Sequence, residues 1–249
     1  MRNWTTPVRK AALKLRGKSL NSESASVAAH SSPQVFTDVS VDPFVRGFLH
    51  HPDNPSGHGV VLTHGAGSNC RAPLLIALAE TFAKAGFTVL RCDLPYRQDR
   101  PYGPPLPGNA KRDRAGLANA VAALKNMAQG RVFLGGHSYG GRQSSMLCAD
   151  APNMVAGLLL LSYPLHSPGK PEQLRTQHFP NLRTPALFVH GTRDPFGSIA
   201  ELDQALKLIP AKTKLLVVEG AGHDLGFKGK ARREELPMQV CETFQSFLL

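Results

Sequence analysis

The sequence has few of the features that mark a membrane, zinc-binding or disulfide-rich protein. Its longest apolar run spans eight residues, Met154 to Leu161, far short of the ~20 that a transmembrane helix needs. The four cysteines lie far apart and form no CxxC pair, so they predict neither a zinc site nor a disulfide scaffold. Cysteines this sparse are typical of a reducing compartment, and we expect a cytoplasmic protein without a membrane span.

Acidic residues are in the minority, and this raises the question of a polyanionic partner. The chain carries 29 Lys and Arg against 18 Asp and Glu, a net charge of +11 at pH 7. Such a charge could attract nucleic acid or anionic lipid. No RNP-like aromatic strand, finger spacing or basic heptad region accompanies it, so we expect no nucleic-acid partner. The excess charge is interpreted as a solvated surface.

The first 34 residues differ in composition from the rest. They hold six basic residues and one acid, and 19–32 is rich in Ser and Ala. We expect residues 1–34 to form a flexible extension, with a domain over 35–249. An Arg- and Ser-rich, acid-poor start also resembles an organellar transit peptide, which would change the expected location from cytoplasmic to organellar.

From about residue 35, short β-branched and leucine-rich runs alternate with helical stripes. The expected strands are 44–50, 59–63, 87–93, 131–135, 155–162, 185–190 and 212–218, and the stripes lie over 74–82, 117–128, 142–149, 198–208 and 240–248. This alternation predicts an α/β fold: a mostly parallel sheet with helices on both faces. Two long proline-containing loops, 95–109 and 163–184, are expected to wall a pocket at the carboxyl ends of the strands.

Gly136-His137-Ser138-Tyr139-Gly140 matches the G-x-S-x-G pattern of a nucleophile elbow. It directly follows an expected strand and precedes an expected helix, which is the context that the elbow requires. A strained backbone at Ser138 would lift its hydroxyl out of the sheet, and glycines on either side would avoid collisions with neighbouring backbone. Ser138 is therefore the candidate nucleophile.

A serine nucleophile needs a base and an orienting acid, and this fold places them in the order Ser, Asp or Glu, His. Asp194 follows the expected strand 185–190, and His223 follows the last expected strand. All three residues come at the carboxyl ends of strands. We predict a catalytic triad of Ser138, His223 and Asp194.

An oxyanion hole needs two backbone N–H groups that face the developing charge. One is expected from Tyr139, the residue after the nucleophile. The other is expected from Ala66, in the His64-Gly65-Ala66-Gly67 loop that follows the strand 59–63. His64 is interpreted as a brace for that loop. No HExxH or His–carboxylate spacing is present, so we expect no metal site and no cofactor.

The motifs together resemble those of α/β-hydrolase-fold proteins. The resemblance rests on LTHGAG, VLRCDLPYR, GGHSYGGR, LSYPLHSPGKPEQLRTQH, HGTRDPFG and GAGHDL, which extend from about residue 59 onward. More narrowly, the chain resembles a family related to testis-expressed protein 30 and to the hydrolase-like domain of NSL-complex subunit 3, loosely grouped with dienelactone hydrolases. That resemblance implies the same triad. It departs at His137, where relatives often carry Lys or Arg.

The expected activity is that of a serine esterase on a small ester or related acyl substrate. No insertion is long enough for a full cap domain, so the site is expected to be open or to be covered by the 163–184 loop alone. The side chains expected to contact the small-molecule substrate are those of Tyr96, Arg97, Tyr163, His166 and His178. Cations on the same rim, Arg97 among them, are compatible with a substrate that carries a carboxylate or phosphate, but we expect them rather to pair with nearby acids or to face water.

A second hypothesis comes from a different functional class. Some animal relatives implied by the resemblance lack a complete triad, so the chain could be a catalytically silent, α/β-hydrolase-like interaction module. A fluorophosphonate probe discriminates the two, because it labels an activated serine and leaves an interaction module unlabelled. The oligomeric state is left open.

Overall fold

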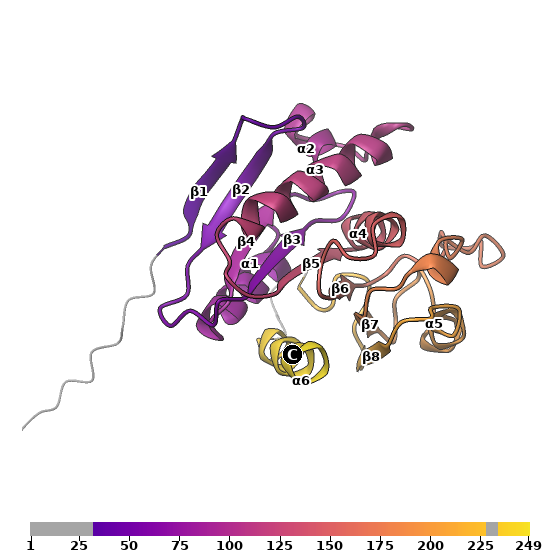
Figure 1. The fold of residues 1–249 in the computed structure, drawn as a ribbon. Helices are drawn as coiled ribbons and strands as arrows, with labels where there is room; N and C mark the ends of the chain where they lie inside the picture. Colours follow the sequence, from indigo (N-terminus) through magenta and orange to yellow (C-terminus); the bar gives the residue numbers. More distant parts are fainter. Residues whose placement is uncertain (1–31, 228–233) are drawn as a thin grey trace, which may run out of the picture. The chain divides into compact units, whose positions relative to one another are not determined.

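The computed structural model describes residues 32–227 and 234–249 (Figure 1). The predicted flexible extension lies almost wholly outside these residues. Gln34, which we assigned to that extension, is the first residue of a strand. In chain order the strands are β1 (Gln34–Asp38), β2 (Val45–His50), β3 (Gly59–Thr63), β4 (Thr88–Cys92), β5 (Val132–His137), β6 (Leu158–Leu161), β7 (Ala186–Gly191) and β8 (Thr213–Val218).

These strands form one sheet in the order β1-β2-β4-β3-β5-β6-β7-β8. β1 and β2 are antiparallel to their neighbours, and the pairs from β4 to β8 are parallel. The predicted α/β fold class with a mostly parallel sheet is confirmed. The strand β1 was not predicted, because its side chains at this edge of the sheet are largely exposed and its sequence lacks the apolar run of a buried strand.

Helices cover both faces of the sheet (Figure 1). The helices are α1 (Pro73–Lys84), α2 (Pro95–Asp99), α3 (Asn109–Lys125), α4 (Tyr139–Asp150), α5 (Ile199–Leu206) and α6 (Leu236–Leu248). Alternate residues of a buried strand point to opposite faces: Val60 packs with α1 and α6, whereas Val61 packs with α3 and α4. The fully buried pattern of β3 follows from this coverage.

The expected loop 95–109 is partly helical, which corrects the prediction. α2 begins at Pro95, whose fixed φ suits the first turn of a helix, and α2 buries Pro95, Tyr96 and Arg97. A five-residue helix is too short to show apolar periodicity, so it could not be predicted from the hydrophobic pattern. Among the described residues, no helix combines the length and apolar character that a bilayer crossing requires.

Candidate active site

Ser138 stands at a sharp turn between β5 and α4. Its backbone has φ 52° and ψ −115°, a left-handed conformation that costs a non-glycine residue energy. Its N–H donates to the carbonyl of Leu161 at 2.8 Å, which anchors the turn to β6. The two motif glycines are sterically required. A Cβ on Gly136 would lie 2.6 Å from the backbone of Gly140, and one on Gly140 would lie 2.5 Å from the carbonyl oxygen of His64.

Gly140→Ala is therefore expected to damage the elbow. The added methyl must displace either the segment at His64 or the start of α4, and overpacking of this kind typically costs ~1–3 kcal/mol. Gly67→Ala is the matched control, because a Cβ there meets no atom within 4 Å. Thermal denaturation should show a drop of several degrees for Gly140→Ala and a small change for Gly67→Ala. Equal melting temperatures for the two variants would contradict the packing described here.

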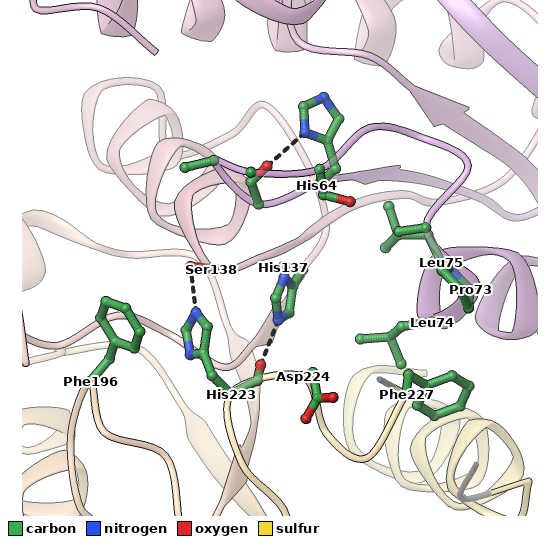
Figure 2. Close-up of a pocket in the computed structure, with 15 residues that line it drawn as sticks. His64, Pro73, Leu74, Leu75, His137, Ser138, Phe196, His223, Asp224 and Phe227 are labelled. Carbon is green, nitrogen blue, oxygen red and sulfur yellow. Dashed lines mark hydrogen bonds between the residues drawn. The ribbon is translucent and has the colours of Figure 1, made fainter. Parts of the chain in front are cut away.

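The side chains of Ser138, His223 and Asp194 form a continuous hydrogen-bonded series (Figure 2 shows the first pair). The hydroxyl oxygen of Ser138 lies 2.8 Å from Nε2 of His223. Nδ1 of His223 lies 2.8 Å and 3.0 Å from the two carboxylate oxygens of Asp194. Since a carboxylate can only accept, Nδ1 carries the imidazole proton and Nε2 is left to accept from the serine hydroxyl. The three residues predicted from the sequence are thus brought together.

Buried groups hold this series in place. Asp194 is 6% exposed, and one of its carboxylate oxygens also accepts the backbone N–H of Phe196 at 2.9 Å. Burial alone would raise the pKa of Asp194, but the hydrogen bond and charge of His223 and the Phe196 amide lower it below its ordinary value. The ring of Phe196 stacks on His223 with 4.2 Å between centroids. Nε2 of His137 donates to the carbonyl of His223 at 2.7 Å, so the neighbour of the nucleophile braces the base (Figure 2).

Two backbone amides near Ser138 are left without acceptors. Within residues 32–227 and 234–249, no group accepts the N–H of Ala66 or of Tyr139. Ala66 lies in the loop after β3, and Tyr139 is the first residue of α4. His64 contacts the same loop, with Nδ1 donating to the Gly65 carbonyl at 2.9 Å and Nε2 accepting from the Leu94 amide at 3.0 Å. Two donors therefore remain without acceptors, one in the residue that follows Ser138 and one in the loop after β3.

A cavity of about 390 Å³ opens beside Ser138 and His223 (Figure 2). Glycine, alanine and serine backbone from residues 65–68 forms one side of it. The other walls are mostly apolar and come from the start of α1, the segment between β7 and α5, and the segment after β8. Their apolar residues are Ala72, Pro73, Leu74, Leu75, Phe196 and Phe227. No residue of the two expected loops, 95–109 and 163–184, lines this cavity, which corrects the prediction that they wall it.

A model of the family described as "Alpha/beta hydrolase domain" matches residues 56–247. The chain belongs to the α/β-hydrolase family. This match confirms the predicted α/β-hydrolase fold. The G-x-S-x-G motif at Ser138, between an expected strand and an expected helix, was the strongest sequence evidence for that fold.

Solved structures with this fold resemble the chain over most of its length. A dienelactone hydrolase from Anabaena variabilis matches with a TM-score of 0.67 and 22% identity, covering 87% of this chain and 99% of that chain. An alpha-beta serine hydrolase homologue from Coxiella burnetii matches with a TM-score of 0.69 and 16% identity, covering 84% and 96%. XC6422 from Xanthomonas campestris, a serine hydrolase without lid, matches with 0.66 and 14%, covering 88% and 96%.

The five side chains expected to contact substrate lie elsewhere in the structure. None of them lines the cavity beside Ser138. Tyr163 donates to the carbonyl of Arg175, His166 to that of Ser167, and His178 pairs with a serine hydroxyl of α4. These three contacts serve the packing of the loop after β6, so their role toward substrate stays a prediction. Tyr96 and Arg97 are buried against the loop after β3.

Sequence reasoning missed the apolar lining of the cavity. Leu74 and Leu75 were interpreted as core residues of an amphipathic helix. Their spacing would be the same whether they line a cavity or pack in the core, so periodicity could not distinguish the two. Phe196 comes two residues after Asp194, and Phe227 comes four residues after His223. Their closeness in sequence to the predicted triad could have indicated that they line the site. Among the described residues, no group of three or more His, Cys, Asp or Glu could hold a metal ion.

Neutral buried histidines are expected to make the stability of this protein sensitive to acid. Burial lowers the pKa to about 4 for His50, His64, His137 and His178, against an ordinary 6.5. Between about pH 6.5 and 4 the unfolded chain therefore binds more protons than the folded one. The free energy of unfolding should fall as pH falls through this window, by up to about 1.4 kcal/mol per pH unit for each such histidine.

Melting temperatures measured from pH 7.5 to 4.5 at constant ionic strength test this expectation. Nε2 of His50 accepts from Arg91 at 2.9 Å, and a glutamine oxygen could accept in its place without titrating. His50→Gln should flatten the acid slope, whereas His51→Gln, at an exposed position, should leave it unchanged. A melting temperature independent of pH over this range would refute the assignment of neutral buried histidines.

Proposed function

We propose that this chain is a serine hydrolase of the esterase type, which cleaves small esters or related acyl substrates through Ser138, His223 and Asp194. The observation that carries the proposal is the hydrogen-bonded series from Asp194 to His223 to Ser138, which ends at the mouth of a cavity. Two of the solved structures above, a serine hydrolase homologue and a serine hydrolase without lid, support the same reaction class.

The first half of the reaction is acyl transfer to the enzyme. Oγ of Ser138 attacks the ester carbonyl carbon while Nε2 of His223 takes the hydroxyl proton. The carbonyl π electrons move to oxygen and form a tetrahedral oxyanion. When this intermediate collapses, the bond to the alcohol oxygen breaks and His223 returns the proton to the leaving alcohol. An acyl ester on Ser138 remains.

The second half is hydrolysis of that acyl ester. His223 takes a proton from water, the resulting oxygen attacks the acyl carbon, and Ser138 leaves with the proton from His223. Asp194 keeps the proton of the base on Nδ1 in both halves and stabilises the imidazolium. The unpaired amides of Ala66 and Tyr139 are the proposed donors to the oxyanion.

The walls of the cavity indicate which substrates fit. Leu74, Leu75 and Phe227 bring apolar side chains to the side of the cavity that faces away from Ser138 (Figure 2). Burial of apolar substrate surface against them is favourable at roughly 25 cal/mol per Å². We therefore propose that an apolar acyl or alcohol portion of the ester occupies this cavity.

The alternative of a catalytically silent interaction module has less support. A module that only binds a partner does not need a strained serine aligned with an imidazole and a buried carboxylate, since each feature costs folding free energy. The same geometry is what activates a nucleophile.

The narrower relationship to the testis-expressed protein 30 and NSL-complex subunit 3 family is also proposed, on the motifs given above. We further propose a cytoplasmic location. All four cysteines are buried and free, as expected for a protein of a reducing compartment.

A panel of p-nitrophenyl esters of increasing acyl length tests the proposed function. We expect turnover that rises with acyl length until the chain fills the cavity and then falls. A fluorophosphonate probe run in parallel should react with the same protein. Absence of both turnover and labelling would favour the interaction module.

A further inference from the structure

The hydroxyl of a buried tyrosine forms hydrogen bonds with residues 65–68, which we call the oxyanion loop. Tyr96 is 2% exposed and lies in α2. Its hydroxyl lies 2.8 Å from the carbonyl oxygen of Ala66 and 3.2 Å from that of Gly65. Tyr96 is thus bonded to both peptide units that flank the Ala66 Cα.

Arg97, the next residue of α2, forms hydrogen bonds with the same loop through its guanidinium group. Nε of Arg97 donates to the carbonyl of Ser68 at 2.7 Å, and one terminal nitrogen donates to that of Ala66 at 3.1 Å. The same nitrogen donates to Gly103 at 2.7 Å, and the other terminal nitrogen donates to Arg100 at 3.0 Å. Arg97 is 6% exposed. Four backbone carbonyls therefore surround this buried cation, a pattern that the planar fork of arginine can satisfy and a lysine cannot.

These contacts fix the directions of the amides in the oxyanion loop. In a planar trans peptide, the C=O and the following N–H point in opposite directions. Anchoring the Gly65 carbonyl on Tyr96 and His64 therefore fixes where the Ala66 N–H points. Anchoring the Ala66 carbonyl on Tyr96 and Arg97 does the same for Gly67.

A buried carboxylate links this arrangement to the second amide donor. One oxygen of Asp113, in α3, accepts the N–H of Tyr96 at 3.0 Å, and the other accepts the hydroxyl of Tyr139 at 2.7 Å. The rings of Tyr96 and Tyr139 meet nearly at right angles, with centroids 5.8 Å apart. Asp113 is fully buried. The residue behind the oxyanion loop and the residue that follows the nucleophile thus share one network.

We propose that Tyr96 and Arg97 are positioning residues, which hold the oxyanion loop so that its amide hydrogens face the charge that develops on the substrate. The proposal rests on the proposed esterase function, and it replaces the expectation that these two side chains contact substrate. A donor that already points at the oxyanion stabilises the transition state without having to reorient as the reaction proceeds. A displaced donor must reorient first, and part of this stabilisation is lost.

Kinetics of Tyr96→Phe and Arg97→Lys test the proposal. Tyr96→Phe removes one hydroxyl and keeps the ring, and Arg97→Lys keeps the charge and loses the fork. Each should lower kcat on a p-nitrophenyl ester by ~10- to 100-fold with KM within about twofold, because a loosened donor acts on the transition state. Tyr102→Phe and Arg183→Lys, both at exposed positions, are the matched controls and should retain full activity.

Amide hydrogen exchange gives a readout that does not depend on activity. The Ser68 N–H donates to the Gly65 carbonyl at 3.0 Å and the Cys70 N–H to Asp93 at 2.7 Å, so both report on the loop. They should exchange several-fold faster in Tyr96→Phe and Arg97→Lys, with amides of α6 unchanged. Unchanged exchange overturns the proposal, whatever the kinetics. Faster exchange with full, Ser138-dependent activity overturns the positioning role. Activity that survives Ser138→Ala overturns the esterase mechanism and with it the positioning role.

Discussion

Ser138→Ala should abolish ester turnover while the protein stays folded. The substitution removes the one atom that attacks the carbonyl, and we expect kcat to fall by ~10³-fold or more. The hydroxyl makes its hydrogen bond to Nε2 of His223, which is 23% exposed and can bond to water instead. Alanine also leaves little empty volume at this position, so the melting temperature should stay within a few degrees of that of the unmodified protein.

Ser246→Ala is the matched control for this experiment. Its hydroxyl bonds to the Thr243 carbonyl on α6, at an exposed position, and its loss should leave turnover unchanged. Hydrolysis of a simple ester at the same rate by Ser138→Ala and by Ser246→Ala would rule out the proposed nucleophile.

Asp194→Asn is expected to lower activity by ~10⁴-fold, the loss known for the corresponding change in Ser-His-Asp enzymes. The local hydrogen bonds explain why. The Phe196 N–H donates to one oxygen of Asp194, so an asparagine would keep its oxygen there and turn its NH₂ toward Nδ1 of His223. An NH₂ group can only donate. His223 would then carry its proton on Nε2 and could not accept the proton of Ser138.

Asp203→Asn serves as the control, because that carboxylate is 62% exposed on α5 and forms only a surface ion pair with Lys207. It should retain full activity. A pH profile separates this role from a merely structural one, since the loss in Asp194→Asn should persist at every pH at which the protein is folded. Near-normal turnover in Asp194→Asn would mean that another group orients the base.

The sequence predicted the elements whose residues are buried on a regular period. β3 was predicted at its observed bounds, because a β-branched run that ends at a glycine loop has few other interpretations. The series Ser138, Asp194 and His223 was predicted because each residue follows a parallel strand, and all such strands end at one edge of the sheet. The order of the three residues along the chain, Ser, then Asp, then His, indicated which of them is the nucleophile, the orienting acid and the base.

What the sequence could not predict depends on contacts between distant segments. Tyr96 and Arg97 were interpreted as substrate contacts, because a polar side chain after a strand faces either solvent or a ligand in most cases. The acceptors of Tyr96, and two of the four acceptors of Arg97, are carbonyls ~30 residues earlier in the chain. Contacts with backbone carbonyls cannot be recognised from the residue types of a sequence. The cavity was missed for a related reason, because its apolar walls from Leu74 and Leu75 resemble an ordinary core.

The most direct test of the account is the site at which a fluorophosphonate reacts. The probe phosphonylates a serine only where a base accepts the serine proton and donors stabilise the oxyanion. Labelling therefore tests the nucleophile, the base and the oxyanion donors in one experiment. Peptide mass spectrometry of the labelled protein should find one adduct, on Ser138, and Ser138→Ala and His223→Ala should prevent labelling. A protein that stays unlabelled, or an adduct at another serine, would contradict the account.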